Sequence, residues 1–502
     1  MGVIVNQSFK GSLYSYIGTA LGFLNVGLLM PIVFSSNQIG LTNLLISISL
    51  IIGQLGTFGF LNATIKLFPF YRDKEKGHHG FPLMMMKVGL AGFVFTTALF
   101  FILKNYLIEA NSEKSQLFVE NIYYLLPLLF VTIFYLLLDN YCVVLFNASI
   151  GIFLKEFLFR ILNLIGIGLF WLGILDFDRF LLFYFVAYSV PTFGLMIYLI
   201  IKGELSLKRD RDFTDKPMRR NLISVSVYGL LAGFSGIAVM NIDRYMVNHY
   251  EGLSGTGIYS TMFYFGTIIM LAGRSLKRIA APVISEAFKK DQPELIGDVY
   301  TRSTLTQLII SSFLFLLVWC NLDSAFALIP AEFQAGRWVV FYIGLSQVIT
   351  MAGGVSHEII QYSKEYKIYT WMMAGFIVLV VVSNMIMIPL YGLPGAAIAS
   401  AISYAIFGYV RFEFIRRRFH MQPYNIHHLV CLLISAVVLG ISMLIPRFDN
   451  FIIDLIIRSG LISVLFIGAL YLLKTSSDIN NLIHQTLSIA GRMLRGKWRK
   501  NS

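Results

Sequence analysis

About fourteen apolar stretches of membrane-spanning length occupy almost the whole chain. The hydrocarbon core of a bilayer is about 30 Å thick and needs about 20 mainly apolar residues per helix. The chain supplies such stretches repeatedly, because 57% of its 502 residues are hydrophobic and 13% are charged. No segment between them is long enough for a soluble domain. The sequence therefore predicts an all-α polytopic membrane protein whose function lies between its helices.

The order of spans and basic loops predicts the orientation of the chain. The expected spans lie near residues 11–34, 40–64, 82–104, 121–147, 152–175, 178–202, 221–247, 254–275, 303–321, 337–359, 368–390, 394–414, 427–446 and 452–473. Lysine and arginine gather in alternate loops, and cytoplasmic loops carry the excess of these residues. An even number of spans keeps both termini on this side, so both are expected in the cytoplasm.

The net charge of +13 has two readings. Clustered basic residues are typical of nucleic-acid binding, but the bias of basic residues toward the inside already explains their distribution. Residues 475–502 place apolar side chains at a helical period among basic ones, which predicts an amphipathic helix on a surface of anionic lipids. Cys142, Cys320 and Cys431 lie in separate spans and form neither a disulfide framework nor a metal pattern. We expect no nucleic acid, no metal and no bound cofactor.

An internal repeat organises the spans. The pattern Ser-x-x-Gly-x-x-x-Gly begins at Ser15 and again at Ser226, 211 residues later. In the following spans Gly40 and Gly257 align at an offset of 217. Small residues at this spacing let helices approach closely. Six spans separate the two patterns, so the halves are expected to be parallel repeats related by an axis along the membrane normal.

This repeat predicts the domain organisation and a transport mechanism. The expected parts are a six-helix bundle at 1–202, a cytoplasmic linker at 203–220, a second six-helix bundle at 221–414, an added helix pair at 415–474 and the basic tail at 475–502. Two equivalent bundles suit alternating access around a central site. The chain has no G-x-x-x-x-G-K-[ST] loop for ATP. Proton or sodium coupling is left open as the energy source.

Basic residues in or near the spans are candidates for binding an anionic headgroup, since charges inside a membrane usually line a cavity or pathway. The set comprises Arg160, Arg274, Lys277, Arg278, Lys66 and Arg244. Arg160 lies about two turns inside its span, where snorkelling to the interface is the alternative. For the three basic residues at 274–278 the alternative is ordinary anchoring at the inner face.

Acidic residues and one histidine form a second set, with a possible role in ion coupling or gating. They are Asp139, Asp243, His357 and Glu358. Asp243 and Arg244 are adjacent, so their side chains are expected to point to different sides of one helix. His357 and Glu358 lie near the inner end of their span, where they form either a proton-carrying site or an interfacial pair.

Several runs of this sequence resemble bacterial polysaccharide flippases of the Wzx type. The runs are GSLYSYIGTALGFLN at 11–25, IGLT at 39–42, GTFGFLNATIKLFP at 56–69, NIDRYM at 241–246, GIYS at 257–260 and IPLYGLPGAAIA at 388–399. Those flippases belong to the multidrug/oligosaccharidyl-lipid/polysaccharide (MOP) exporter superfamily, and the similarity covers nearly the whole chain. It implies a MATE-like, V-shaped pair of bundles.

The resemblance implies a function. Such a protein moves an undecaprenyl-diphosphate-linked oligosaccharide repeat unit from the inner to the outer leaflet of the bacterial cytoplasmic membrane, for O-antigen, capsule or exopolysaccharide synthesis. It performs no covalent chemistry and works beside other polysaccharide-assembly membrane proteins. Arginine and lysine suit the diphosphate.

Three alternatives remain. Two are a lipid II flippase, with which the number of spans agrees, and a cation-coupled drug antiporter, which would favour an acidic cavity. The third belongs to another class, a membrane-embedded glycan polymerase or ligase. Such an enzyme is expected to have a sizeable outer loop, whereas the longest outer segments, 105–120 and 322–336, are short.

Overall fold

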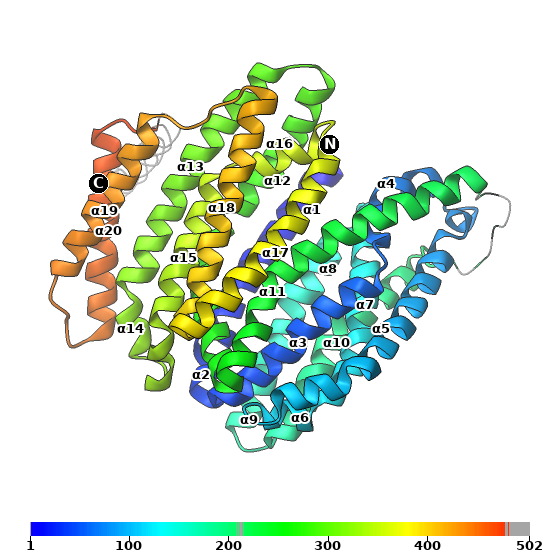
Figure 1. Ribbon diagram of the computed structural model, residues 1–502, viewed down its shortest axis with the longest axis horizontal. Helices are drawn as coiled ribbons and strands as arrows, with labels where there is room; N and C mark the ends of the chain where they lie inside the picture. Colours follow the sequence, from blue (N-terminus) through cyan, green and yellow to red (C-terminus); the bar gives the residue numbers. More distant parts are fainter. Residues whose placement is uncertain are drawn as a thin grey trace, which may run out of the picture. The chain divides into compact units, whose positions relative to one another are not determined.

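The computed structural model describes residues 2–476 and residue 480, apart from residues 207, 209, 211, 212 and 214. Every regular element in this part of the chain is a helix, as Figure 1 shows. Helices are expected here because a helix satisfies its own backbone hydrogen bonds where no water is present. The all-α prediction is confirmed. The predicted basic tail at 475–502 lies almost entirely outside the described residues.

The chain divides into two compact units. Unit 1 comprises Met1–Tyr264, Ile329–Val339 and Lys367–Ser400, and unit 2 comprises Phe265–Leu328, Val340–Tyr366 and Ala401–Ser502. Unit 1 contains α1 (Gly2–Gly22), η1 (Phe23–Leu29), α2 (Met30–Val33), α3 (Ser36–Gly56), α4 (Phe60–Tyr71), η2 (Gly77–Gly80), α5 (Phe81–Asn111), α6 (Gln116–Glu120), η3 (Ile122–Tyr124), α7 (Leu125–Val144), α8 (Ala148–Ile152), η4 (Phe153–Leu158), α9 (Phe159–Trp171), α10 (Phe177–Ile201), most of α11 (Lys216–Thr267), η6 (Ala331–Gly336) and most of α17 (Tyr366–Tyr391). Unit 2 contains η5 (Ile268–Met270), α12 (Leu271–Lys289), α13 (Pro293–Cys320), α14 (Leu322–Phe326), most of α15 (Arg337–Ala352), α16 (Ser356–Tyr362), most of α18 (Leu393–Phe419), α19 (Ile426–Leu444) and α20 (Phe451–Leu472). The segments η1 and η4 are π-helices, and the other η segments are 3₁₀ helices.

Eleven helices among the described residues are long and apolar enough to cross a membrane, or twelve if the bent pair of α15 and α16 is one span. The difference from the expected fourteen has two local causes. Helix α11 carries two expected spans, which meet at Gly252 with φ 73°. The span expected at 152–175 is divided by the π-helical turn η4 into α8, η4 and α9.

Gly40 and Gly257 occupy equivalent positions of the sequence repeat. In unit 1, each of them contacts the helix of the other. A Cβ atom at Gly40 would lie 2.0 Å from the carbonyl oxygen of Leu253, and one at Gly257 would lie 1.9 Å from that of Ser36. Ser36 and Leu253 are themselves separated by the repeat offset. The Oγ atoms of Ser36 and Ser254 lie 2.8 Å apart beside this contact. Helix α3 and the second part of α11 therefore cross backbone to backbone at equivalent positions, as a two-fold relation between the halves would produce.

The start of the linker is fixed to the loop between α4 and α5. His78 Nε2 lies 2.7 Å from Glu204 Oε2, and Lys74 Nζ lies 2.8 Å from Glu204 Oε1. The ring of His79 stacks on that of Phe213 at a centroid distance of 3.7 Å. Burial raises the pKa of the Glu204 carboxyl, but the hydrogen bonds from Lys74 and His78 outweigh burial and hold this pKa below its ordinary value. Glu204 is therefore ionised at neutral pH and ties the segment after α10 to the loop between α4 and α5.

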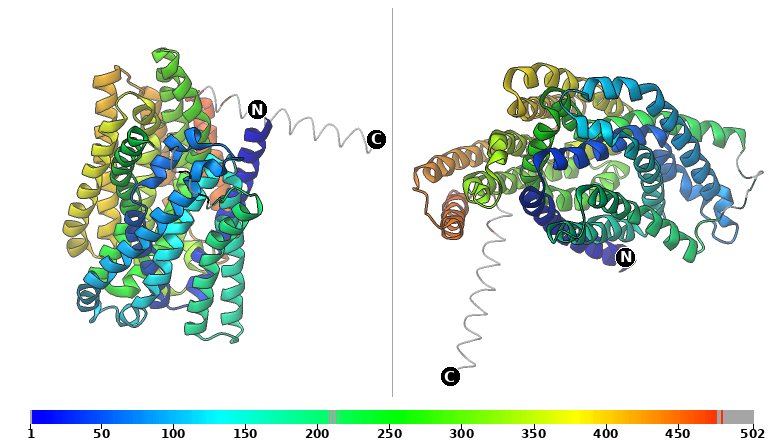
Figure 2. Two further views of the ribbon diagram at one scale, coloured as in Figure 1. Left: turned by 90° about the vertical axis from the view of Figure 1, so that its right-hand side faces the viewer. Right: turned by 90° about the horizontal axis from the view of Figure 1, so that it is seen from below.

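The last helix pair packs on unit 2. Figure 2 shows α19 and α20 side by side, and both contact α13. A buried cluster joins side chains of α13, α19 and α20, including Leu308, Cys431, Val438, Ile462 and Phe466. The opposite faces of α19 and α20 expose leucine, isoleucine and valine, as a surface in contact with lipid does.

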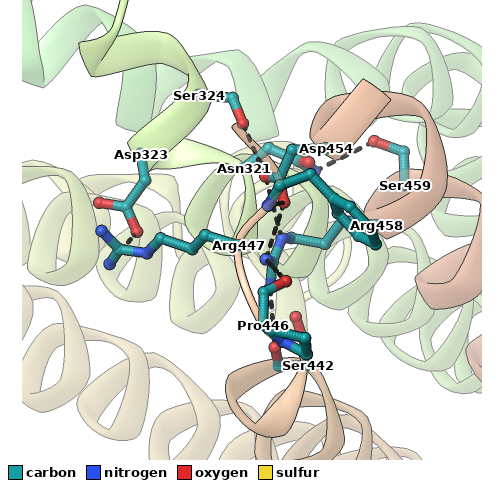
Figure 3. A network of polar contacts seen from close by, with 10 residues as sticks. Asn321, Asp323, Ser324, Ser442, Pro446, Arg447, Asp454, Arg458 and Ser459 are labelled. Carbon is teal, nitrogen blue, oxygen red and sulfur yellow. Dashed lines mark hydrogen bonds and ion pairs between the residues drawn. The ribbon is translucent and has the colours of Figure 1, made fainter. Parts of the chain in front are cut away.

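A buried ion pair fixes one end of this helix pair (Figure 3). Arg458 Nη2 lies 3.0 Å from Asp454 Oδ1, and the two side chains are 8% and 6% exposed. The guanidinium of Arg458 also donates to the carbonyl of Ser442 at the end of α19, at 2.8 Å. Asp454 Oδ2 accepts from Ser324 Oγ of α14 at 2.8 Å. The pair thus joins α20 to α19 and to the segment that follows α13.

Replacement of Arg458 by leucine tests this role. The variant leaves the Asp454 carboxylate buried without its cation, which costs about 3–5 kcal/mol. Arg447→Leu is the matched control, because Arg447 is 68% exposed and its ion pair with Asp323 is worth at most about 1 kcal/mol. Thermal unfolding of the purified protein in detergent measures both variants. Adding Asp454→Asn to Arg458→Leu removes the stranded charge and is expected to recover part of the loss. Equal melting temperatures for the Arg458 and Arg447 variants would contradict this role.

Candidate functional site

Arg160 lies between helices of unit 1, directly after the π-helical turn η4. Its carbonyl oxygen accepts a hydrogen bond from Asn25 Nδ2 at 2.7 Å. Asn25 belongs to η1, the second π-helical segment, and its side chain is fully buried. A π-helical turn widens a helix and changes the direction of its side chains, and such turns are frequent at functional sites. The two irregular segments therefore hold the backbone of Arg160.

The guanidinium of Arg160 is directed toward α1 and the second part of α11. Its Nη2 and Nε atoms lie 3.0 and 3.3 Å from Glu156 Oε2. A Cβ atom at Gly22 would lie 1.9 Å from Arg160 Nη1 and 2.2 Å from the hydroxyl of Tyr264. Only glycine at position 22 leaves room for the guanidinium and for this hydroxyl group. The side chain of Arg160 is 21% exposed, so its charge lies within unit 1 and is still accessible.

Two further charged residues, Asp139 and Lys155, lie on the segments next to Arg160. A Cβ atom at Gly151 would lie 1.7 Å from Asp139 Oδ1, so the Asp139 carboxylate packs against α8. Lys155 Nζ lies 4.2 Å from the ring centroid of Tyr135. The two bases, Arg160 and Lys155, are matched in formal charge by Glu156 and Asp139. This part of unit 1 is thus polar and close to neutral rather than uniformly cationic.

Asp243 forms the centre of a second polar cluster in unit 1. It is 3% exposed. Its Oδ2 accepts from Ser400 Oγ at 2.7 Å and from the hydroxyl of Tyr259 at 3.0 Å, and its Oδ1 accepts from Asn384 Nδ2 at 2.9 Å. All three donors are neutral. The Oδ1 of Asn384 is buried without a hydrogen-bond partner. Side chains of α11, α17 and α18 therefore place several oxygen atoms around one carboxylate.

Arg244 turns away from the Asp243 cluster. Its Nη1 donates to the carbonyl of Met240 at 3.3 Å and to Asn241 Oδ1 at 3.2 Å. Its guanidinium lies 4.9 Å from the ring centroid of Phe263. The two adjacent side chains thus make different hydrogen bonds, although their charges still interact.

The other candidates lie elsewhere. Lys66 is exposed on α4. His357 and Glu358 lie in the first turn of α16 in unit 2, where Glu358 is 6% exposed. The side chains of Arg274, Lys277 and Arg278, on α12, lie outside the described part of the chain. Of the candidate residues, the structure therefore places Arg160 and Asp139 next to α8 and η4, which are consecutive segments. Asp243 and Arg244 lie together on α11.

Sequence reasoning missed most partners of these residues. Glu156 precedes Arg160 by four residues, a spacing that pairs side chains on a helix and that could have revealed it. Nothing in the sequence points to Asn384 or Ser400, which are 141 and 157 residues from Asp243.

Comparison with known proteins identifies the fold. No protein-family model matches the chain. The probable low-salt glycan biosynthesis flippase Agl15 of Haloferax volcanii is 22% identical over 189 residues, which cover 37% of this chain and 40% of that protein. The match therefore spans less than half the length of this curated relative.

Two solved structures superpose over most of the chain. The lipid II flippase MurJ in an inward closed conformation has a TM-score of 0.68 at 14% identity, covering 92% of this chain and 98% of its own. An inward-facing multidrug resistance MATE family transporter of the MOP superfamily has a TM-score of 0.65 at 16% identity, covering 80% and 94%. The expected MATE-like fold is confirmed: the chain is an all-helical polytopic membrane protein with the fold shared by MurJ and the MATE transporters of the MOP superfamily.

Proposed function

We propose that this protein is a flippase that moves a lipid-diphosphate-linked oligosaccharide across the membrane by alternating access and breaks no covalent bond. The fold is that of transporters, and the partial match to a glycan biosynthesis flippase supports a lipid-linked glycan as the substrate. The proposal includes the cytoplasmic membrane of a bacterium as the location, both termini on the inside, two six-helix bundles at 1–202 and 221–414, and undecaprenyl diphosphate as the carrier.

The observation that carries the proposal is the position of Arg160. Its guanidinium lies inside unit 1, next to irregular helices and packed against Gly22. A planar guanidinium binds phosphate oxygens through two parallel hydrogen bonds. Glu156 occupies this fork in the structure. An arriving diphosphate would take its place, and a group with two or more negative charges competes better than a singly charged one. We also keep the other basic candidates as proposed contacts to the diphosphate: Lys66, Arg244, Arg274, Lys277 and Arg278.

The Asp243 cluster is proposed as the coupling site. A carboxylate held by three neutral donors, next to the unpartnered oxygen of Asn384, offers hard oxygen ligands to a proton or a sodium ion. The hydrogen bonds to Asp243 come from neutral groups, and Arg244 interacts with the carboxylate through its charge without a hydrogen bond to it. Asp139, His357 and Glu358 stay proposed with a lesser role in coupling or gating.

The crossing of α3 and α11 is proposed as a contact that opens and closes during transport. It joins the two halves at equivalent glycines and at the pair of hydroxyl groups of Ser36 and Ser254. Ser36 Oγ also lies 3.1 Å from Glu332 Oε2, to which it can donate. Such short polar contacts between halves can form in one state and be released in another.

The alternatives give different outcomes in the same assays. A lipid II flippase would move a peptide-bearing lipid, a drug antiporter would move amphipathic cations without a lipid-linked glycan, and a polymerase or ligase would lengthen or transfer the glycan. Leaflet-resolved labelling of the lipid-linked glycan, in cells or proteoliposomes, decides between transport and covalent chemistry. Normal outward labelling without the protein, in a background free of other flippases, would end the proposal.

Arg160→Gln is expected to slow outward translocation on the order of tenfold or more, because it removes a charge-assisted contact to the diphosphate. Arg160→Lys is expected to fall between this variant and the wild type, because it keeps the charge and loses the planar fork. Arg179→Gln is the surface control, since Arg179 is 71% exposed. The double variant Glu156→Gln with Arg160→Gln leaves no stranded charge and separates loss of binding from loss of stability. A wild-type rate for the double variant would remove Arg160 from the site.

Asp243→Asn is expected to abolish the dependence of translocation on a proton or sodium gradient, because the amide keeps the shape of the carboxylate without its charge. Translocation in proteoliposomes with and without each imposed gradient is the measurement. Asp449→Asn, at an exposed loop position, is the control. If the Asp243 variant still responds to the gradient, coupling takes place elsewhere.

A disulfide between positions 36 and 254 is expected to stop translocation, because it locks the contact between the halves. The Ser36→Cys, Ser254→Cys double variant is made in a background in which Cys142, Cys320 and Cys431 are replaced by alanine. Oxidation is expected to abolish outward labelling, and a reductant to restore it, while either single variant stays active. Full activity of the oxidised protein, with the cross-link verified by mass spectrometry, would show that this contact does not open.

A further inference from the structure

Among the described residues, a buried arginine in unit 2 forms no ion pair. Arg411, on α18, is 6% exposed, and its guanidinium lies 4.8 Å from the ring centroid of Phe407. Its Nε atom has no hydrogen-bond partner, and no described residue forms an ion pair with it. Arginine stays charged in proteins, and a charge inside a membrane protein is unfavourable without a partner. A ring face alone compensates only part of this cost.

Arg411 lies at the break between α15 and α16. The two helices are bent by 51° across this break, where Gly354 has φ 55°. A Cβ atom at Gly353 would lie 3.5 Å from Arg411 Nη2. The partial negative charge at the end of α15 favours a nearby cation. The broken helix therefore positions the guanidinium and contributes to its stability.

The backbone acceptors at the break are already in use. The carbonyl of Thr350 accepts from Gly353 N, that of Met351 from Gly354 N and that of Gly353 from Ser356 N. The carbonyl of Ala352 accepts from the hydroxyl of Tyr424 at 3.3 Å. No hydrogen bond among the described residues joins Arg411 to these carbonyls, although each has a second lone pair.

A second buried donor without a partner lies nearby. Tyr300, on α13, is 1% exposed, and its hydroxyl forms no hydrogen bond. It is close enough to Arg411 for the two groups to interact electrostatically. Three and four residues further along α13, Ser303 and Thr304 pack against Gly354, so this face of α13 lines the break. Arg411 Nε and the hydroxyl of Tyr300 are thus two buried donors without an acceptor. A ligand with hydrogen-bond acceptors and negative charge would satisfy both.

We propose that Arg411, together with Tyr300, binds one phosphate group at the break between α15 and α16. The planar fork of the guanidinium matches two oxygens of a phosphate, and a phenol can donate to a third. Arg411 precedes the exposed basic run that begins at Arg416 by five residues, which is about 8 Å along a helix. This depth suits the phosphate of an anionic lipid headgroup, and the same chemistry suits free phosphate or pyrophosphate. The site lies in unit 2 and is independent of the proposed contact at Arg160.

Thermal stabilisation of the delipidated full-length protein in neutral detergent tests the site. One arm adds sodium phosphate or pyrophosphate at constant ionic strength, and the other adds phosphatidylglycerol to the micelles, with phosphatidylcholine as the neutral reference. A saturable rise in melting temperature in the first arm alone identifies a soluble phosphate, and one in the lipid arm alone identifies a headgroup. The wild type is expected to respond in at least one arm.

Variants assign the response to this site. Arg411→Gln is expected to weaken apparent affinity about tenfold or more, and Tyr300→Phe about fivefold, since it removes one hydrogen bond. Arg416→Gln, an exposed position on the same helix, is expected to bind as the wild type does. Arg160→Gln is measured in parallel, to separate this site from the proposed transport site. If Arg411→Gln does not fold, Arg411→Lys and Tyr300→Phe carry the test. The absence of a saturable rise in both arms, or an unchanged affinity in the Arg411 and Tyr300 variants, would overturn the proposal. A loss confined to Arg160→Gln would place the anion at the proposed transport site instead.

Discussion

Inside a bilayer a backbone polar group has no water to bond, so each departure from a regular helix needs compensation within the protein. The main departures here are the π-helical segments η1 and η4 and the break between α15 and α16. Each lies beside a charged side chain inside its unit. Arg160 follows η4 and bonds through its backbone to η1, and Arg411 faces the break at Gly353. Irregular backbone and unusual side chains thus occur together, because a widened or interrupted helix gives a long polar side chain both space and a partial charge to oppose its own.

Glycine provides the space for the charge of Arg160. The sequence repeat has glycines at the equivalent positions of its second copy, but these glycines contact different side chains. Gly18 and Gly22 of the first half pack against Glu156 and Arg160. The equivalent glycines of the second half, at 229 and 233, meet the neutral amides of Asn62 and Gln54. The same pattern of small residues therefore permits close packing twice but creates a charged site once. This asymmetry is consistent with the proposal that the halves share a scaffold and differ in what they bind.

The fold leaves the substrate open, since one scaffold serves lipid flippases and drug transporters alike, and only the side chains can distinguish them. The charges of Arg160 and Lys155 are matched by those of Glu156 and Asp139, so this part of unit 1 carries no net formal charge. Under the proposed function, a ligand has to displace Glu156 from the guanidinium, which favours a diphosphate over a monoanion. The hydrogen bonds to Asp243 come from neutral donors instead, and its one basic neighbour among the described residues, Arg244, interacts with it through charge alone.

The sequence by itself determined the helical membrane fold, because a span in a bilayer satisfies its own backbone and is recognised by length and hydropathy alone. It also identified Arg160, Asp139 and Asp243, since a charge stands out in an apolar stretch. Only the tertiary structure decided what these residues contact. Asn384 and Ser400 are ordinary polar residues in sequence and become ligands of Asp243 because α17 and α18 lie beside α11. Arg411 was missed because it lies five residues before a basic run typical of an inner helix end, and its burial depends on where α13 and the α15 break lie. A hydropathy pattern describes one helix at a time, whereas a site consists of side chains that several helices bring together.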